Sequence, residues 1–173
     1  VNVYYEYYHA LQESAFIDEK LGDTYEFGDD TRRGPHWFYS GASTFMADYA
    51  VRKRESNNNL SPIKDWLKQQ FLFGESLIEQ SGCSEITLKK ISPENCFNLK
   101  FYWGEPAVAY LLSSISNPNA LNEVFYPNLY QLGFKDAFEL TFDKTLEEFY
   151  TEWDSIMQKS IDERINLISS FGL

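Results

Sequence analysis

The sequence has few basic residues, few cysteines and no long apolar run. Its 173 residues include 15 Lys and Arg against 26 Asp and Glu, a formal net charge of −11, and basic residues never occur in a run of five or more. This charge repels the phosphates of nucleic acids and anionic lipid headgroups. The longest apolar stretch, about Ala107 to Leu112, is far shorter than the roughly 20 residues that cross a bilayer. We therefore expect no nucleic-acid partner and no membrane span.

Cysteine and histidine are equally scarce, with two residues of each type. Cys83 and Cys96 lie in a turn-rich stretch, where a disulfide would close a short loop if the compartment were oxidising. We expect two free thiols, with the disulfide as the alternative. His9 and His36 are the only imidazoles from which a metal or catalytic site can be built.

Aromatic residues, in contrast, are abundant, with 12 Tyr, 14 Phe and 4 Trp. Together with a hydrophobic content of 43%, they supply enough apolar area for a core and exclude a disordered chain. Six of them are candidates to line a cleft that stacks on a peptide or a sugar: Tyr5, Tyr8, Trp37, Tyr39, Tyr102 and Trp103. Because aromatic side chains at helical spacing are more often core, we favour the core for this group.

Helical periodicity runs through most of the chain, with almost no sustained alternation of period two. We predict a mainly α, multi-helix, single domain over residues 1–173. Helices are predicted at residues 3–13, 35–54, 61–80, 97–115, 117–133 with a break at Pro127, 134–142, and 146 through 161. Ser61-Pro62 is typical of a helix start, Gly133 of a helix end, and Thr145 with Glu148 forms a capping box.

Two stretches lack this periodicity. Residues 16–34 form the longest predicted loop. Within residues 82–96, the apolar Ile86, Leu88 and Ile91 form either a short extended piece or one helical turn.

The first predicted helix has two unlike sides. One side carries Val3, Tyr4, Tyr7, Tyr8, Ala10 and Leu11, and the other carries Tyr5, Glu6, His9, Gln12 and Glu13. We expect the second side to be a solvated polar face or to hold a hydrogen-bonded pair. The second predicted helix is expected to bury Phe38, Gly41, Ala42, Phe45, Met46 and Tyr49. Its opposite side is small or polar, which would let another helix approach closely.

Two short segments carry the residue spacing of a zinc site. Tyr5 and His9 are four residues apart on a helix and so face the same way, with Glu6 placed between them to activate a metal-bound water. Residues 37–42 read Trp-x-x-x-Gly-Ala, which is close to a Trp-x-x-x-Gly-x-Ala pattern, with Ser40 directly before the glycine.

These segments resemble those of the gluzincin, or peptidase-MA-like, zinc metallopeptidases, which are relatives of thermolysin and aminopeptidase N. Residues 5–12 are similar to the family's H-E-x-x-H helix, and residues 37–45 to a second helix that begins with a pattern such as W-L-x-E-G-x-A-x-Y. Residues 101–112 resemble the Tyr- and Gly-containing helix beside the family's cleft, and residues 137–149 its closing segment. The resemblance covers nearly the whole chain and implies the helical part of these enzymes.

The resemblance also implies a role for each matched position. His9 matches the second zinc-binding histidine and Glu6 the general base, whereas Tyr5 replaces the first histidine and Ser40 the ligand glutamate. A neutral tyrosine, with a pKa near 10, and a serine hydroxyl are poor zinc ligands. We therefore expect a catalytically degenerate domain with no zinc cofactor, in which Glu6 is vestigial.

The former active-site groove is expected to act as a pocket for a peptide or a protein. Tyr5, Tyr39, Ser40 and Tyr102 are its expected lining, and Tyr102 or Phe101 matches the family's cleft tyrosine. Family members place a sheet-containing segment before the first helix, and this sequence begins inside that helix. We expect either a fragment of a longer protein or a groove that lacks one wall.

Two other interpretations are compatible with the same residues. His36 and Ser40 share one helix face, so His9, His36 and Glu6 are candidates for a rebuilt zinc site in a residual peptidase or hydrolase. Alternatively, the chain is an unrelated helical domain.

Overall fold

The computed structural model describes residues 2–16, 27–29, 31–55, 61–83 and 85–168. In chain order the helices are α1 (Asn2–Phe16), α2 (His36–Glu55), α3 (Ser61–Ser81), α4 (Leu99–Tyr102), α5 (Gly104–Ser114), α6 (Tyr126–Phe142), α7 (Leu146–Met157) and α8 (Ile161–Ile168). A 3₁₀ turn, η1 (Leu88–Lys90), and a π-helical turn, η2 (Leu121–Phe125), join them. Within these ranges no β-strand forms beyond two isolated bridge pairs, so the predicted mainly α class is confirmed.

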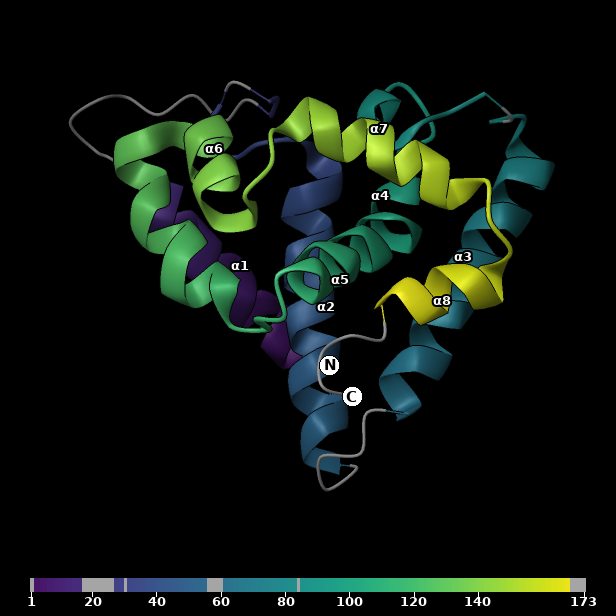
Figure 1. The fold of residues 1–173 in the computed structure, drawn as a ribbon, viewed down its shortest axis with the longest axis horizontal. Coiled ribbons are helices and arrows are strands. Elements are labelled where there is room, and N and C mark those ends of the chain that lie inside the picture. Colours follow the sequence, from purple (N-terminus) through teal and green to yellow (C-terminus); the bar gives the residue numbers. More distant parts are fainter. Residues whose placement is uncertain (1, 17–26, 30, 56–60, 84, 169–173) are drawn as a thin grey trace.

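Helix α5 lies near the middle of a roughly triangular molecule and crosses α2 (Figure 1). The two backbones touch there because both carry glycine. A Cβ on Gly41 would lie 2.3 Å from the carbonyl of Gly104, and one on Gly104 would lie 2.3 Å from the carbonyl oxygen of Trp37. Contacts this short leave no room for any side chain, so both positions require glycine.

Buried rings surround this crossing. Phe38 of α2 contacts the rings of Phe125, Phe134, Phe138 and Phe142, at centroid distances of 5.0 to 6.3 Å. All the residues that α2 was predicted to bury are buried. Trp37 and Trp103 are core residues, as predicted, whereas Tyr5, Tyr8, Tyr39 and Tyr102 are half-buried.

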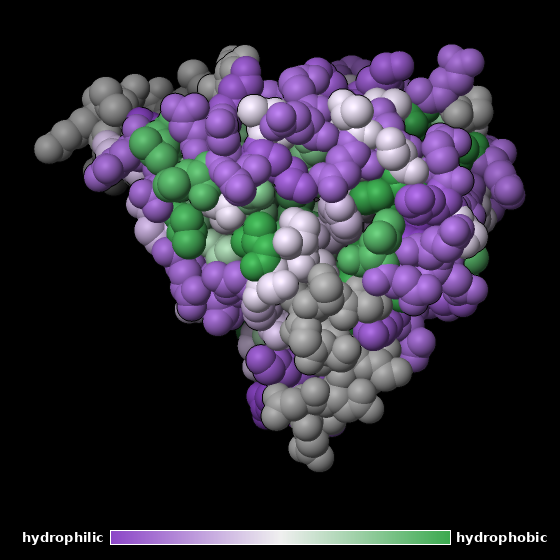
Figure 2. Space-filling view, in the orientation of Figure 1, coloured by the Kyte–Doolittle hydropathy of each residue, from purple (hydrophilic) through white to green (hydrophobic). Residues whose placement is uncertain are grey.

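The surface in view is largely hydrophilic, with apolar side chains gathered over α6 and beside α8 (Figure 2). No helix in the described part of the chain combines the length and apolar character needed to span a membrane.

Three predicted helix boundaries are wrong. The helix predicted over residues 97–115 is two helices, because the chain bends at Trp103 and α5 begins at Gly104. Pro127 does not break a helix but lies in the first turn of α6, where a missing N–H costs nothing. The last predicted helix ends at Met157, and α8 begins after Ser160, whose hydroxyl oxygen accepts from the backbone N–H of Glu163.

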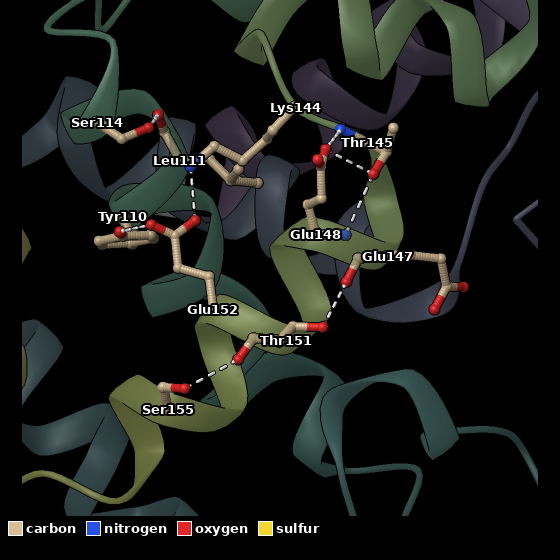
Figure 3. A network of polar contacts seen from close by, with 10 residues as sticks. All are labelled: Tyr110, Leu111, Ser114, Lys144, Thr145, Glu147, Glu148, Thr151, Glu152 and Ser155. Carbon is tan, nitrogen blue, oxygen red and sulfur yellow. Dashed lines mark hydrogen bonds and ion pairs between the residues drawn. The ribbon is translucent and has the colours of Figure 1, made fainter.

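Other signals predicted the boundaries correctly. Gly133 has φ +77° and kinks α6, as its helix-ending role requires. At the start of α7, the Thr145 Oγ1 accepts from the Glu148 backbone N–H at 3.2 Å, and the Glu148 carboxylate accepts from the Thr145 N–H at 2.8 Å (Figure 3). The bonds that the Glu148 carboxylate accepts from the backbone N–H and the hydroxyl of Thr145 lower the pKa of Glu148. The predicted capping box is therefore confirmed.

The expectation of two free thiols is wrong, because Cys83 and Cys96 form a disulfide. The bridge joins the two ends of the loop over residues 82–96, and both cysteines line an open pocket of about 540 Å³. Of the two conformations left open for this stretch, the helical turn is the one formed, as η1. Leu88 and Ile91 are buried and hold it against the core.

Candidate functional site

Helix α1 turns its polar side toward α2, so the expectation that this side is a solvated face is wrong. Gln12 is 1% exposed, whereas Val3 is 81% and Tyr7 59% exposed. The Gln12 amide donates to the backbone oxygen of Tyr39 at 2.9 Å and to the Tyr126 hydroxyl at 3.0 Å. The physical reason is the partner surface: α2 offers small side chains and hydrogen-bond acceptors there, as predicted for a close helix approach.

His9 lies between two tyrosine rings at this contact. Its ring stacks on Tyr39 at a centroid distance of 4.7 Å and meets the edge of Tyr5 at 4.3 Å. Nε2 is 3.3 Å from the Ser43 hydroxyl. Nδ1 is buried and has no hydrogen bond of normal geometry to a described residue. Burial lowers the pKa of His9, although the side chain of Gln12 raises it in part. The imidazole is therefore neutral at pH 7.

The two tyrosines beside His9 are neutral phenols. Burial raises the pKa of Tyr5, and the hydrogen bond with Ser43 offsets this only in part. The Tyr39 hydroxyl donates to Glu13 Oε1 at 2.8 Å, while Arg33 pairs with Glu13 Oε2 at 2.6 Å. Burial, and then the Glu13 carboxylate, raise the pKa of Tyr39 far above its usual value. Neither ring is poised to become the phenolate that zinc ligation needs.

Ser40 is buried on α2 next to this contact. Its carbonyl accepts from the hydroxyls of Ser43, at 2.9 Å, and Thr44, at 2.8 Å. His9 meets Tyr39 and Ser43, which are four residues apart and flank Ser40. Glu6 is exposed to solvent.

His36 lies at the start of α2 in a separate group of rings. It stacks on Phe27 at 3.9 Å and meets the edge of Phe97 at 5.1 Å. The Lys100 ammonium sits 3.5 Å from the centroid of Phe97. Burial lowers the pKa of His36, and the positive charge of Lys100 lowers it further. The ring of Phe27 also contacts Tyr39, at 5.3 Å, and so links the two imidazole environments.

The candidate ligands do not form a metal centre in the described part of the chain. Among those residues, no group of three or more His, Cys, Asp or Glu side chains is placed to hold a metal ion. Tyr5, His9 and Tyr39 are in contact, whereas the ring of Tyr102 meets Phe73 on α3, at 5.9 Å.

The sequence did not indicate the roles of several residues around the two imidazoles: Gln12, Glu13, Arg33, Ser43 and Lys100. A signal existed for Ser43, which is four residues after Tyr39 on the same helix face. The roles of Arg33 and Lys100 depend on tertiary packing between elements far apart in the sequence, for which no local signal exists.

Comparison with protein-family models, with curated proteins and with solved structures gave no match to this chain. The family resemblance therefore rests on the quoted residues alone.

Proposed function

We propose that this chain is a catalytically degenerate relative of the gluzincin metallopeptidases that acts as a binding or structural module. The observation that carries the proposal is the contact of α1 with α2. His9, at the second H-E-x-x-H ligand position, meets α2 at Tyr39 and Ser43, and Tyr5, at the first, interacts with Ser43. Tyr39 and Ser43 lie on either side of Ser40 in the sequence. A pairing of these two helices is what the family pattern would require, and in this chain rings and hydroxyls occupy the contact.

The chemistry of this contact supports structure over catalysis. Zinc hydrolases need three good ligands and an open coordination position for water. Here the imidazole of His9 stacks on one ring, and its Nε2 lies beside a hydroxyl. Each aromatic pair of this kind stabilises a fold by about 0.5–1.5 kcal/mol beyond its burial. Glu6 then has no metal-bound water to activate.

A peptide or a protein remains the proposed partner. The exposed side of α1 supports a protein partner. A shallow cavity of about 340 Å³ lies there, lined by Val3, Tyr4, Tyr7 and Tyr8 together with Ala50 of α2. Exposed apolar side chains gathered in this way are typical of contact surfaces.

The second candidate is a residual zinc hydrolase that uses His9, His36 and Glu6. Its support is that both imidazoles have a lowered pKa and so are neutral, the form that binds zinc. Against it, the positive charge of Lys100 acts on both imidazoles.

Zinc stoichiometry and peptidase turnover together separate the two candidates. Untagged protein is dialysed against zinc and back into buffer, its zinc is measured by elemental analysis, and hydrolysis of a peptide mixture is followed. We expect well under one zinc per chain, and the same background turnover for wild type and Glu6→Gln. About one zinc per chain, lost in His36→Ala, with turnover abolished in Glu6→Gln, would instead establish the hydrolase.

A further inference from the structure

Two acidic side chains are buried close to the crossing of α2 and α5. Asp48 of α2 is 3% exposed and Glu105 of α5 is fully buried. Burial of an ionised carboxylate costs several kcal/mol unless cations or hydrogen bonds compensate it. Glu105 follows Gly104, the residue at which the two backbones touch, so α5 has little freedom to move this carboxyl toward solvent.

Both carboxyl groups turn to the same donor. The indole N–H of Trp66, on α3, donates to Glu105 Oε1 at 2.9 Å and also interacts with the Asp48 carboxylate. Two acceptors that share one N–H lie within a few ångströms of each other. The other oxygen of Glu105, Oε2, is buried and has no hydrogen-bond partner among the described residues.

Two positive charges act on Asp48, first the Arg52 guanidinium of α2 and then the amino terminus of the chain, and of these two Arg52 also acts on Glu105. Arg52 Nε is 3.5 Å from Asp48 Oδ1, and the guanidinium lies over the ring of Trp66 at 4.6 Å. The charged and polar groups that face Glu105 are thus Asp48 and Arg52 from α2 and Trp66 from α3. Among the described residues, Glu105 thus has one indole N–H and one guanidinium to compensate a negative charge, and both of these groups act on Asp48 as well.

We propose that Asp48 and Glu105 hold one proton in common, that Oε2 of Glu105 carries it as a hydroxyl donor to Asp48, and that the pair is a pH-sensitive lock between α2 and α5. A shared proton satisfies the orphaned oxygen and removes one of the two negative charges. Burial, and then the Asp48 charge, raise the pKa of Glu105 well above its usual value, against smaller opposing effects of Trp66 and Arg52. The two groups titrate as a coupled pair.

The sign of the pH effect follows from this proton. An unfolded chain releases the Glu105 proton near pH 4.3, whereas the folded chain keeps it to a higher pH. The lock therefore contributes fully below about pH 4.3 and is lost as the pH rises through the folded value. Ionisation releases one proton to solvent and leaves two anions that strain the α2–α5 contact.

Glu105→Gln tests the lock, because the amide keeps an acceptor for Trp66 and supplies a donor for Asp48. Urea unfolding of wild type, Glu105→Gln and the exposed control Glu139→Gln is measured from pH 5 to pH 8. As the pH rises, we expect the unfolding equilibrium constant of wild type to increase relative to that of Glu105→Gln, by up to about tenfold per pH unit. Glu139→Gln should track wild type. Parallel curves for wild type and Glu105→Gln would overturn the proposal.

Infrared spectroscopy gives a second readout that needs no variant to be stable. Folded wild type at pH 7 should show the carbonyl stretch of a protonated, buried carboxylic acid. The band should be absent from Glu105→Gln. If that variant does not fold, the band should instead change its position in Asp48→Asn, because the hydrogen-bond partner of the Glu105 carboxyl has changed. A wild-type spectrum without this band at pH 7 would overturn the shared proton directly.

Discussion

Burial between rings decides the protonation of His9. The imidazole lies against Tyr39 and Tyr5, where a positive charge would lose its hydration. The same burial holds the two tyrosines in their neutral forms. Three groups at or beside the ligand positions of the family pattern thus hold no charge at neutral pH, which suits a helix contact.

The imidazole titration of His9 can be measured directly, because the chain has only two histidines. We expect NMR to give His9 a pKa below the usual value of about 6.5, with His36→Gln used to assign its signals. Because the pKa of the folded state is depressed, His9 contributes stability above about pH 6.5 that is lost as the pH falls through the folded value. A pKa of 6.5 or higher would contradict the burial of its ring.

At the α2–α5 crossing, the residue that α2 can carry at position 41 depends on the neighbouring helix α5. Alanine is the better helix former by about 1 kcal/mol, so helix propensity alone favours Gly41→Ala. The crossing opposes it, because the new Cβ would lie 2.3 Å from backbone atoms of Gly104 that cannot turn away.

We expect Gly41→Ala to lower the free energy of unfolding by about 3 kcal/mol in urea denaturation. Gly82→Ala is the matched control, since a Cβ there meets open space and only the positive φ of +72° is strained. The control should cost about 1 kcal/mol. Equal losses in the two variants would contradict a backbone contact at the crossing.

Local signals in the sequence predicted one capped helix start and one kink correctly. Thr145 with Glu148 placed the start of α7, and Gly133 placed the kink in α6. The break before α5 also had a signal, because Gly104 and Pro106 suit a helix start. It was missed because the apolar pattern runs through it without a change of period.

At the scale of the whole molecule, the sequence predicted the mainly α class but not the polar interior. The burial of Asp48 and Glu105 arises where α2, α3 and α5 meet, and no local pattern specifies that meeting. The solvated polar face expected for α1 is wrong for the same reason. Its hydrogen-bond partners belong to α2 and α6, so the polar side of the helix is the one that pairs.

If the contact of α1 with α2 preserves the positions of a lost zinc site, as we propose, rebuilding the ligands should restore zinc binding. The variant Tyr5→His/Ser40→Glu restores the full family pattern, and Tyr8→His/Thr44→Glu introduces the same residues at unmatched positions. Zinc per chain is measured after dialysis, together with the thermal midpoint with and without zinc.

We expect the restored variant to retain about one zinc per chain and to melt at a higher temperature with zinc, since a ligand that binds only the folded state stabilises it. The control should do neither. A folded Tyr5→His/Ser40→Glu chain that retains no more zinc than the control would contradict the metallopeptidase origin and favour an unrelated helical domain.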